Sequence, residues 1–161
     1  MNKLINYTIM IQRIQTLYLL VATLLMALTL FLPIAEFYIQ GIDFTLGAFS
    51  LSSAYVSYST AWLGILLVLA VIIPLVTIFL FKRRTLQIRL CAVEAVVLVG
   101  AIIFIALYYW LANRMFEGFN VEDKQLGWAA IMPVLALILD VLAARAIFKD
   151  EVLVRSLDRI R

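Results

Sequence analysis

The side chains that could do chemistry in this sequence are few, and three of them lie within long apolar stretches. Glu94, Asp140 and Arg145 are charged residues among aliphatic and aromatic neighbours. A charge in such a stretch is costly to bury, faces other helices rather than lipid, and usually has a partner. These three residues are therefore expected either to hold helices together or to carry protons or ions.

The depth of each charge along its helix indicates which of them can meet. If the apolar stretches end at residues 90 and 148, Glu94 lies about 6 Å and Arg145 about 5 Å from that end, at roughly 1.5 Å per residue. Because the two depths match, we expect an ion pair between Glu94 and Arg145. Asp140 lies deeper, about 12 Å in, and points about 140° away from Arg145 on the same helix.

Asp140 has small neighbours, Ala136 and Ala144, one turn away on either side. Such a face lets another helix approach closely. We expect Asp140 to be protonated at neutral pH and hydrogen-bonded to an oxygen on another span, either Thr23 or the carbonyl of Ala70 that Pro74 leaves free. A relay of protons or ions through Asp140 and Glu94 is the alternative.

Other chemistry has little support in the sequence. There is no histidine, and Cys91 is the single cysteine, so haem ligation by His, most zinc chemistry and an intrachain disulfide are excluded. No nucleophile–base pair, glycine-rich phosphate loop or metal-ligand spacing is present. We therefore expect no enzymatic activity, no catalytic residue, no cofactor and no metal site.

The composition indicates where these residues reside. Of the 161 residues 66% are hydrophobic and only 14% are charged, against about 25% charged in an average soluble domain. A soluble domain of this size buries only roughly 70% of the surface of its unfolded chain, which leaves too much apolar surface in water. A soluble globule, a disordered chain and a nucleic-acid-binding protein are excluded.

Four apolar stretches are long enough to cross about 30 Å of hydrocarbon. They cover about 14–34, 60–81, 90–112 and 126–148. We predict an all-α protein, a single integral membrane domain over 1–161 in which four helices form a bundle. No cleavable signal peptide is expected, because the first stretch is longer than a signal core and no small-x-small site follows it.

Basic residues predict the orientation of these spans. Eleven of the 13 Lys and Arg residues fall on one side, including Lys82, Arg83, Arg84 and Arg89 between the second and third spans. Loops rich in Lys and Arg stay in the cytoplasm, so both termini and the 82–89 loop are predicted to be cytoplasmic. These four residues are expected to anchor the topology, and binding of anionic lipid or a protein is the alternative.

The segments outside the spans differ in kind. The first external loop, 35–59, alternates apolar and polar residues around Gly41, which predicts a small β-hairpin or extended cap. Tyr and Trp residues at the outer ends of the spans are typical of a membrane interface, with an aromatic ligand-binding patch as the alternative. The external loop at 113–125 is polar and small.

The C-terminal tail, 149–161, predicts an amphipathic helix. Leu153, Leu157 and Ile160 recur on one helical face. Such a helix either lies along the anionic membrane surface or extends the fourth span as a straight rod. The stripe is expected to bury itself against the bilayer or against a partner protein.

Three segments carry a resemblance to a known family. They are MIQRIQTLYLL at 10–20, FLPIAEF at 31–37 and KDEVLVRSLDRIR at 149–161. Together with four spans, they resemble an uncharacterised family of small four-span inner-membrane proteins that is typical of Bacteroidetes and catalogued as a domain of unknown function. The resemblance covers 10–161. Members usually begin at a methionine that corresponds to Met10, so the first nine residues depart from the pattern.

The resemblance implies a bacterial inner-membrane location and brings no activity, substrate or site residue. We expect a non-enzymatic accessory or scaffold subunit that acts through helix packing, the external cap and the tail. Its expected partners are the lipid bilayer and another membrane protein or further copies of itself, and no nucleic acid. The alternatives are a small proton or ion conductor using Glu94 and Asp140, and lipid or small-molecule binding at the cap.

Overall fold

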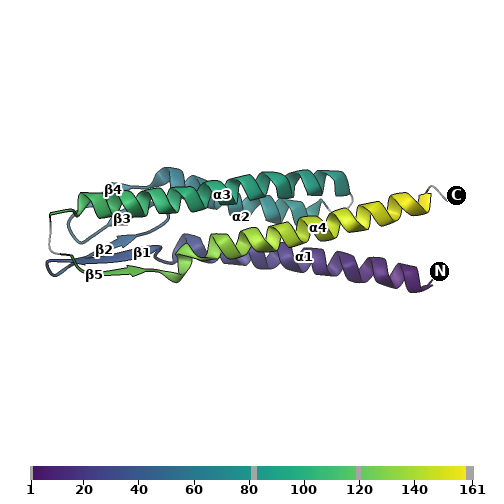
Figure 1. Ribbon diagram of the computed structural model, residues 1–161, viewed down its shortest axis with the longest axis horizontal. Helices are drawn as coiled ribbons and strands as arrows, with labels where there is room; N and C mark the ends of the chain where they lie inside the picture. Colours follow the sequence, from purple (N-terminus) through teal and green to yellow (C-terminus); the bar gives the residue numbers. More distant parts are fainter. Residues whose placement is uncertain (1, 81–82, 119–120, 159–161) are drawn as a thin grey trace.

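The computed structural model describes residues 2–80, 83–118 and 121–158, with side chains described from residue 14 to residue 152 except within the gaps and at residue 122. Four long helices run antiparallel in sequence order and form a bundle (Figure 1). They are α1 (Asn2–Phe31), α2 (Ala61–Phe79), α3 (Arg84–Met115) and α4 (Met132–Asp158), the last preceded by a short 3₁₀ turn, Trp128–Ala130. Each helix packs on two neighbours, in the cyclic order α1, α2, α3, α4.

All four helices are long and apolar enough to cross a membrane. The apolar part of each is buried within the bundle over only 28% to 33% of its residues, so most of each span presents apolar side chains outward. The predicted spans are therefore confirmed as apolar helices. The third is longer than predicted, because α3 begins at Arg84 rather than near residue 90.

Each helix buries a single seam whose side chains recur alternately three and four residues apart. This mean spacing of 3.5 residues is typical of left-handed bundles with knobs-into-holes packing. The seam of α3 includes Gln87, Cys91, Glu94, Leu98, Ala101 and Ile105. The seam of α4 consists of Pro133, Ala136, Asp140, Ala143, Ile147 and Asp150. Buried polar residues on these helices thus occupy the same stripe as the aliphatic core.

A five-stranded antiparallel sheet caps one end of the bundle, which corrects the prediction of an all-α protein with a small extended cap. Four strands come from the segment between α1 and α2: β1 (Ala35–Ile39), β2 (Ile42–Leu46), β3 (Ser50–Ser52) and β4 (Ser57–Ser59). The fifth, β5 (Val121–Leu126), lies between α3 and α4 and pairs with β1, giving the order β4-β3-β2-β1-β5. No strand was predicted in this polar segment.

Backbone geometry and aromatic packing hold the sheet in place. Gln40 and Gly41 both have positive φ, 51° and 78°, as a two-residue type I′ hairpin turn between β1 and β2 requires. Phe37 of β1 faces the bundle, with its ring 5.5 Å from that of Tyr109 and 5.6 Å from that of Phe116 at the end of α3. The sheet is therefore joined to the helices by a shared aromatic core.

The C-terminal tail continues the fourth helix, because α4 is unbroken as far as Asp158. The prediction that the tail is helical is confirmed up to that residue, in the form of an extension of span four. The side chains of Leu153 and Leu157, and residue Ile160 as a whole, lie outside the described part of the chain.

Candidate functional site

The structure brings together the two acidic residues that the sequence placed inside the spans. Glu94 lies on the seam of α3 and Asp140 on the seam of α4, with exposed fractions of 0% and 1%. Their carboxyl groups interact with each other, and the Cys91 thiol lies against Asp140. Sequence reasoning did not include Cys91 in this site. It lies three residues before Glu94 on the same helix face, and this spacing could have identified Cys91 as a neighbour of the acidic pair.

The surroundings of this carboxyl pair are apolar. Cys91 packs in one cluster with Leu19, Ala143 and Ile147, which come from α1 and α4. Within the described residues, both oxygens of Glu94 and Oδ1 of Asp140 are buried without a hydrogen bond of good geometry. The pair is thus enclosed, and the polar group beside its two carboxyl groups is the Cys91 thiol.

The predicted ion pair between Glu94 and Arg145 is wrong. Arg145 lies on the exposed side of α4, while Glu94 faces the seam. The two residues lie at matching depths, but they point in different directions around their helices. The α4 residues that face the seam near this depth are Ala143 and Ile147, whereas Arg145 points away from it. The expected oxygen partner from span one is also not seen, since the Thr23 hydroxyl donates to the Leu19 carbonyl of its own helix at 2.8 Å.

A second polar group closes the opposite end of the bundle from the sheet. Arg84 Nη1 lies 3.1 Å from Asp150 Oδ2, which ties the start of α3 to the end of α4. Nearby, Gln87 Nε2 donates to the Thr77 carbonyl of α2 at 3.0 Å. Asp150 was not singled out in the sequence. It follows Asp140 by ten residues, a separation that the alternating steps of three and four residues along the α4 seam produce.

The other basic residues of this region have a simpler placement. Arg83 and Arg89 are exposed, as residues that anchor topology or meet anionic headgroups require. Arg84 differs from them because it takes part in the ion pair with Asp150. Lys82, the fourth basic residue singled out in the sequence, lies outside the described residues.

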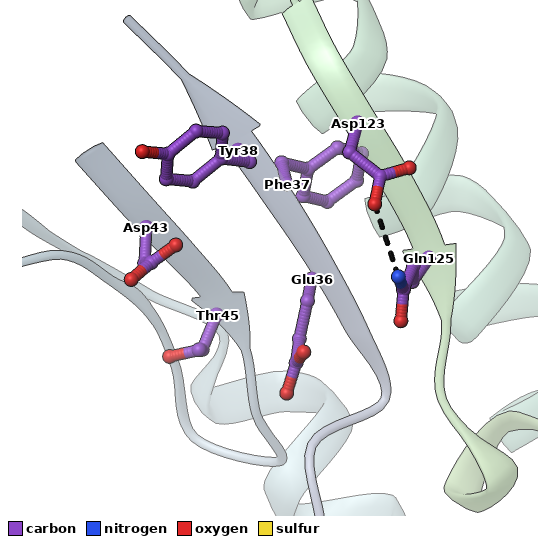
Figure 2. Close-up of a pocket in the computed structure, with 7 residues that line it drawn as sticks. All are labelled: Glu36, Phe37, Tyr38, Asp43, Thr45, Asp123 and Gln125. Carbon is purple, nitrogen blue, oxygen red and sulfur yellow. Dashed lines mark hydrogen bonds between the residues drawn. The ribbon is translucent and has the colours of Figure 1, made fainter. Parts of the chain in front are cut away.

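The outer face of the sheet carries a groove of about 390 Å³. Figure 2 shows that it is formed by side chains from three adjacent strands, β1, β2 and β5. Its lining consists of Glu36, Phe37, Tyr38, Asp43, Thr45, Asp123 and Gln125. The Gln125 amide donates to Asp123 Oδ2 at 3.0 Å, which fixes one wall of the groove.

The groove is acidic but is not shaped to hold a metal ion. Glu36, Asp43 and Asp123 contribute its three carboxylates. Among the described residues, no group of three or more His, Cys, Asp or Glu side chains has an arrangement that could hold a metal. The groove therefore offers a polar, negatively charged surface on the sheet.

Comparison with known proteins agrees with the resemblance seen in the sequence. No match is found among curated proteins. A family model described as "Domain of unknown function (DUF4293)" matches residues 11–160. The match starts directly after Met10 and includes the three segments that carried the resemblance, except for their outermost residues, Met10 and Arg161. The chain therefore belongs to the family described as a domain of unknown function, DUF4293.

Proposed function

We propose that this protein is a non-enzymatic accessory or scaffold subunit of a bacterial inner membrane, with both termini in the cytoplasm and the sheet outside. The observation that carries the proposal is the enclosure of Glu94 and Asp140 between α3 and α4. A conducting pathway needs ionisable groups that alternate with water or with one another across the membrane. A single buried pair between aliphatic layers instead holds two helices in register.

Three features support the membrane placement. The helices are long and apolar, and α1 begins and α4 ends at the same end of the bundle (Figure 1). Basic residues are concentrated at that end, which favours a cytoplasmic location for it. Trp62, Trp110 and Trp128 are exposed near the sheet, where an outer membrane–water interface would place amphipathic indole rings.

The surfaces that would serve a scaffold lie at the two ends of the bundle. Outside, the sheet presents the exposed side chains Glu36 and Tyr38 beside those of β2 and β5. Inside, α4 extends beyond its apolar part to Asp158. A partner membrane protein or a second copy of the chain would meet these surfaces while lipid covers the spans.

The proposal is tested by purifying the tagged full chain in mild detergent after cross-linking in cells. We expect a complex of fixed stoichiometry that is lost when Glu36 and Asp43 are both changed to Lys. Val96→Ala serves as the control, because Val96 is 72% exposed on a span and faces lipid in this arrangement. Recovery of a monomer from native cells, with no defined complex under any cross-linking condition, would contradict the proposal.

One rival function is favoured by the contact between Glu94 and Asp140. A small proton conductor would use the pair as a binding step, with the proton passing from one carboxyl group to the other. This function requires access from both sides of the membrane, and it predicts proton flux through the purified protein.

A second rival is binding of a small molecule at the cap, favoured by the groove on the sheet. Its carboxylates would select a cationic ligand, and Tyr38 would cover it (Figure 2). This function predicts that ligand binding, rather than complex formation, is lost in the Glu36→Lys and Asp43→Lys variant.

A further inference from the structure

We propose that Glu94 and Asp140 form a proton-binding site, in which the two facing carboxyl groups hold at least one proton at neutral pH. This proton takes the place of a counter-cation at the contact between α3 and α4. The inference goes beyond the proposed function and does not depend on it.

The geometry of the pair requires a bound positive charge. Both side chains are almost completely buried, and three of their four carboxyl oxygens lack a hydrogen bond of good geometry within the described residues. Two adjacent carboxylates in an apolar interior would repel each other strongly, and neither would recover the hydration that it loses. A proton between them removes one charge and supplies a donor to the unpaired oxygens.

No described side chain provides the compensating charge. Arg145, Lys149 and Arg89, the basic residues nearest in sequence, are exposed. Arg84 is occupied by Asp150. The titratable side chains that pack in this region are Cys91 of α3 and Tyr18 of α1. A thiol and a phenol cannot supply a positive charge, and the side chain that α2 contributes here is Ile78.

The ligand set favours a proton over a metal ion. Hard cations are bound by about six or more oxygen ligands. Here the pair has a thiol and aliphatic side chains around it, and no described group of acidic or cysteine side chains is arranged to hold a metal. A proton needs only two oxygens, which is what the site offers.

Infrared spectroscopy of the purified full chain in lipid nanodiscs tests the site directly. At neutral pH we expect the carbonyl absorption of a protonated carboxylic acid, with a small shift in heavy water. The band should be lost in the Glu94→Gln and Asp140→Asn double variant and reduced in each single variant. Asp150→Asn is the matched control, because Asp150 is a buried seam acid of the same helix that has a cation partner, and it should leave the band unchanged.

Thermal unfolding gives a second readout that does not rely on the band. A group that keeps its proton only in the folded state loses its contribution to stability as pH rises. The melting temperature of the native protein should therefore fall by about 5 °C more than that of the double variant when pH is raised well above neutral. Replacing sodium with choline at constant ionic strength should not change the melting temperature of the native protein or of the double variant.

Two outcomes would overturn the proton site. One is an infrared spectrum in which the native protein and the double variant are identical in the carboxylic-acid region. The other is a melting temperature that rises with sodium in the native protein alone, which would assign the pair to a metal cation. Either result would leave the accessory function standing, whereas proton flux would contradict that function and leave the binding site intact.

Discussion

At the scale of single residues, α4 carries two buried acids in different electrostatic surroundings. Asp150 is paired with Arg84 at 3.1 Å, near the end of the bundle. Asp140 faces Glu94 in the apolar interior, without a basic neighbour among the described side chains. The first acid contributes an ion pair between two helices, and the second contributes a contact that depends on protonation.

The ion pair between Arg84 and Asp150 should be measurable by a double-mutant cycle. The Asp150 side chain is 4% exposed and that of Arg84 24% exposed, so solvent screens the pair only in part. We expect Arg84→Ala and Asp150→Asn each to lower the free energy of unfolding in detergent, with a coupling energy of about 1 kcal/mol. Strict additivity of the two single changes would show that the contact contributes nothing to stability.

Arg145, by contrast, should matter little to stability. It is exposed on α4, so Arg145→Ala is expected to change the free energy of unfolding by less than about 0.5 kcal/mol. The same change combined with Glu94→Ala should be additive, because the two side chains do not meet. A coupling above about 1 kcal/mol would restore the ion pair that matched depth alone had indicated.

The sequence identified Glu94 and Asp140 correctly as interior residues but paired Glu94 with the wrong partner. Depth follows from residue number and helix rise, so it can be predicted from sequence. The phase of each helix about its axis is set by which stripe the other helices cover. In spans that are apolar on every face, hydrophobicity does not mark this stripe. The seam is defined by three-dimensional packing, as between Cys91 of α3 and Ala143 and Ile147 of α4.

At the scale of elements, the junction between sheet and helices depends on a close backbone approach. Gly127 lies between β5 and the turn that starts α4, and its N–H donates to the Ile34 carbonyl at 2.9 Å. A Cβ atom at this position would collide with the backbone carbonyl of Pro33. Any residue could adopt the backbone angles of Gly127, so its φ and ψ do not require glycine. Glycine is required because the neighbouring backbone leaves no room for a Cβ atom.

Gly127→Ala should consequently destabilise the cap. We expect a loss of about 1–3 kcal/mol in unfolding free energy, since backbone must shift to admit the methyl group. Gly100→Ala is the matched control, because the nearest atom to its added Cβ would be a Leu66 side-chain carbon at 4.0 Å. That helical change should be neutral or stabilising by up to about 1 kcal/mol. Equal stability of the two variants would contradict the close approach.

The strands differ in how far they can be predicted from the sequence. The hairpin of β1 and β2 was predicted, because alternating residues flank Gln40 and Gly41, which form the turn. β5 was not predicted, because its residues VEDKQL are mostly polar and its external edge is open. Its stability comes from backbone pairing with β1 and from the aromatic residues beneath that strand. Neither contribution appears in the alternation of β5 itself.

At the scale of the whole molecule, the bundle is polar at its two ends and apolar along its length. The sheet end carries the acidic groove, and the opposite end carries the Arg84–Asp150 pair with the exposed residues Arg83 and Arg89. By the positive-inside rule, this distribution of charge supports our proposal that the sheet lies outside a bacterial cytoplasmic membrane.

Cysteine labelling of intact cells tests this orientation. In a Cys91→Ala background, a cysteine at Ala54, which is exposed between β3 and β4, should react with a membrane-impermeant thiol reagent. A cysteine at the exposed Thr85 should react only after the cells are opened. Labelling of Thr85→Cys but not Ala54→Cys in intact cells would reverse the topology.

The measurement that tests the accessory function most directly is proton flux in proteoliposomes. Native protein and the Asp140→Asn variant are reconstituted at equal density, with assembly checked by gel filtration, and a pH gradient and membrane potential are applied. An accessory protein with an enclosed Glu94–Asp140 pair predicts flux no greater than that of empty liposomes for both proteins. Flux that depends on pH in the native protein and disappears in a correctly assembled Asp140→Asn variant would contradict it, and would establish Asp140 as a transport residue.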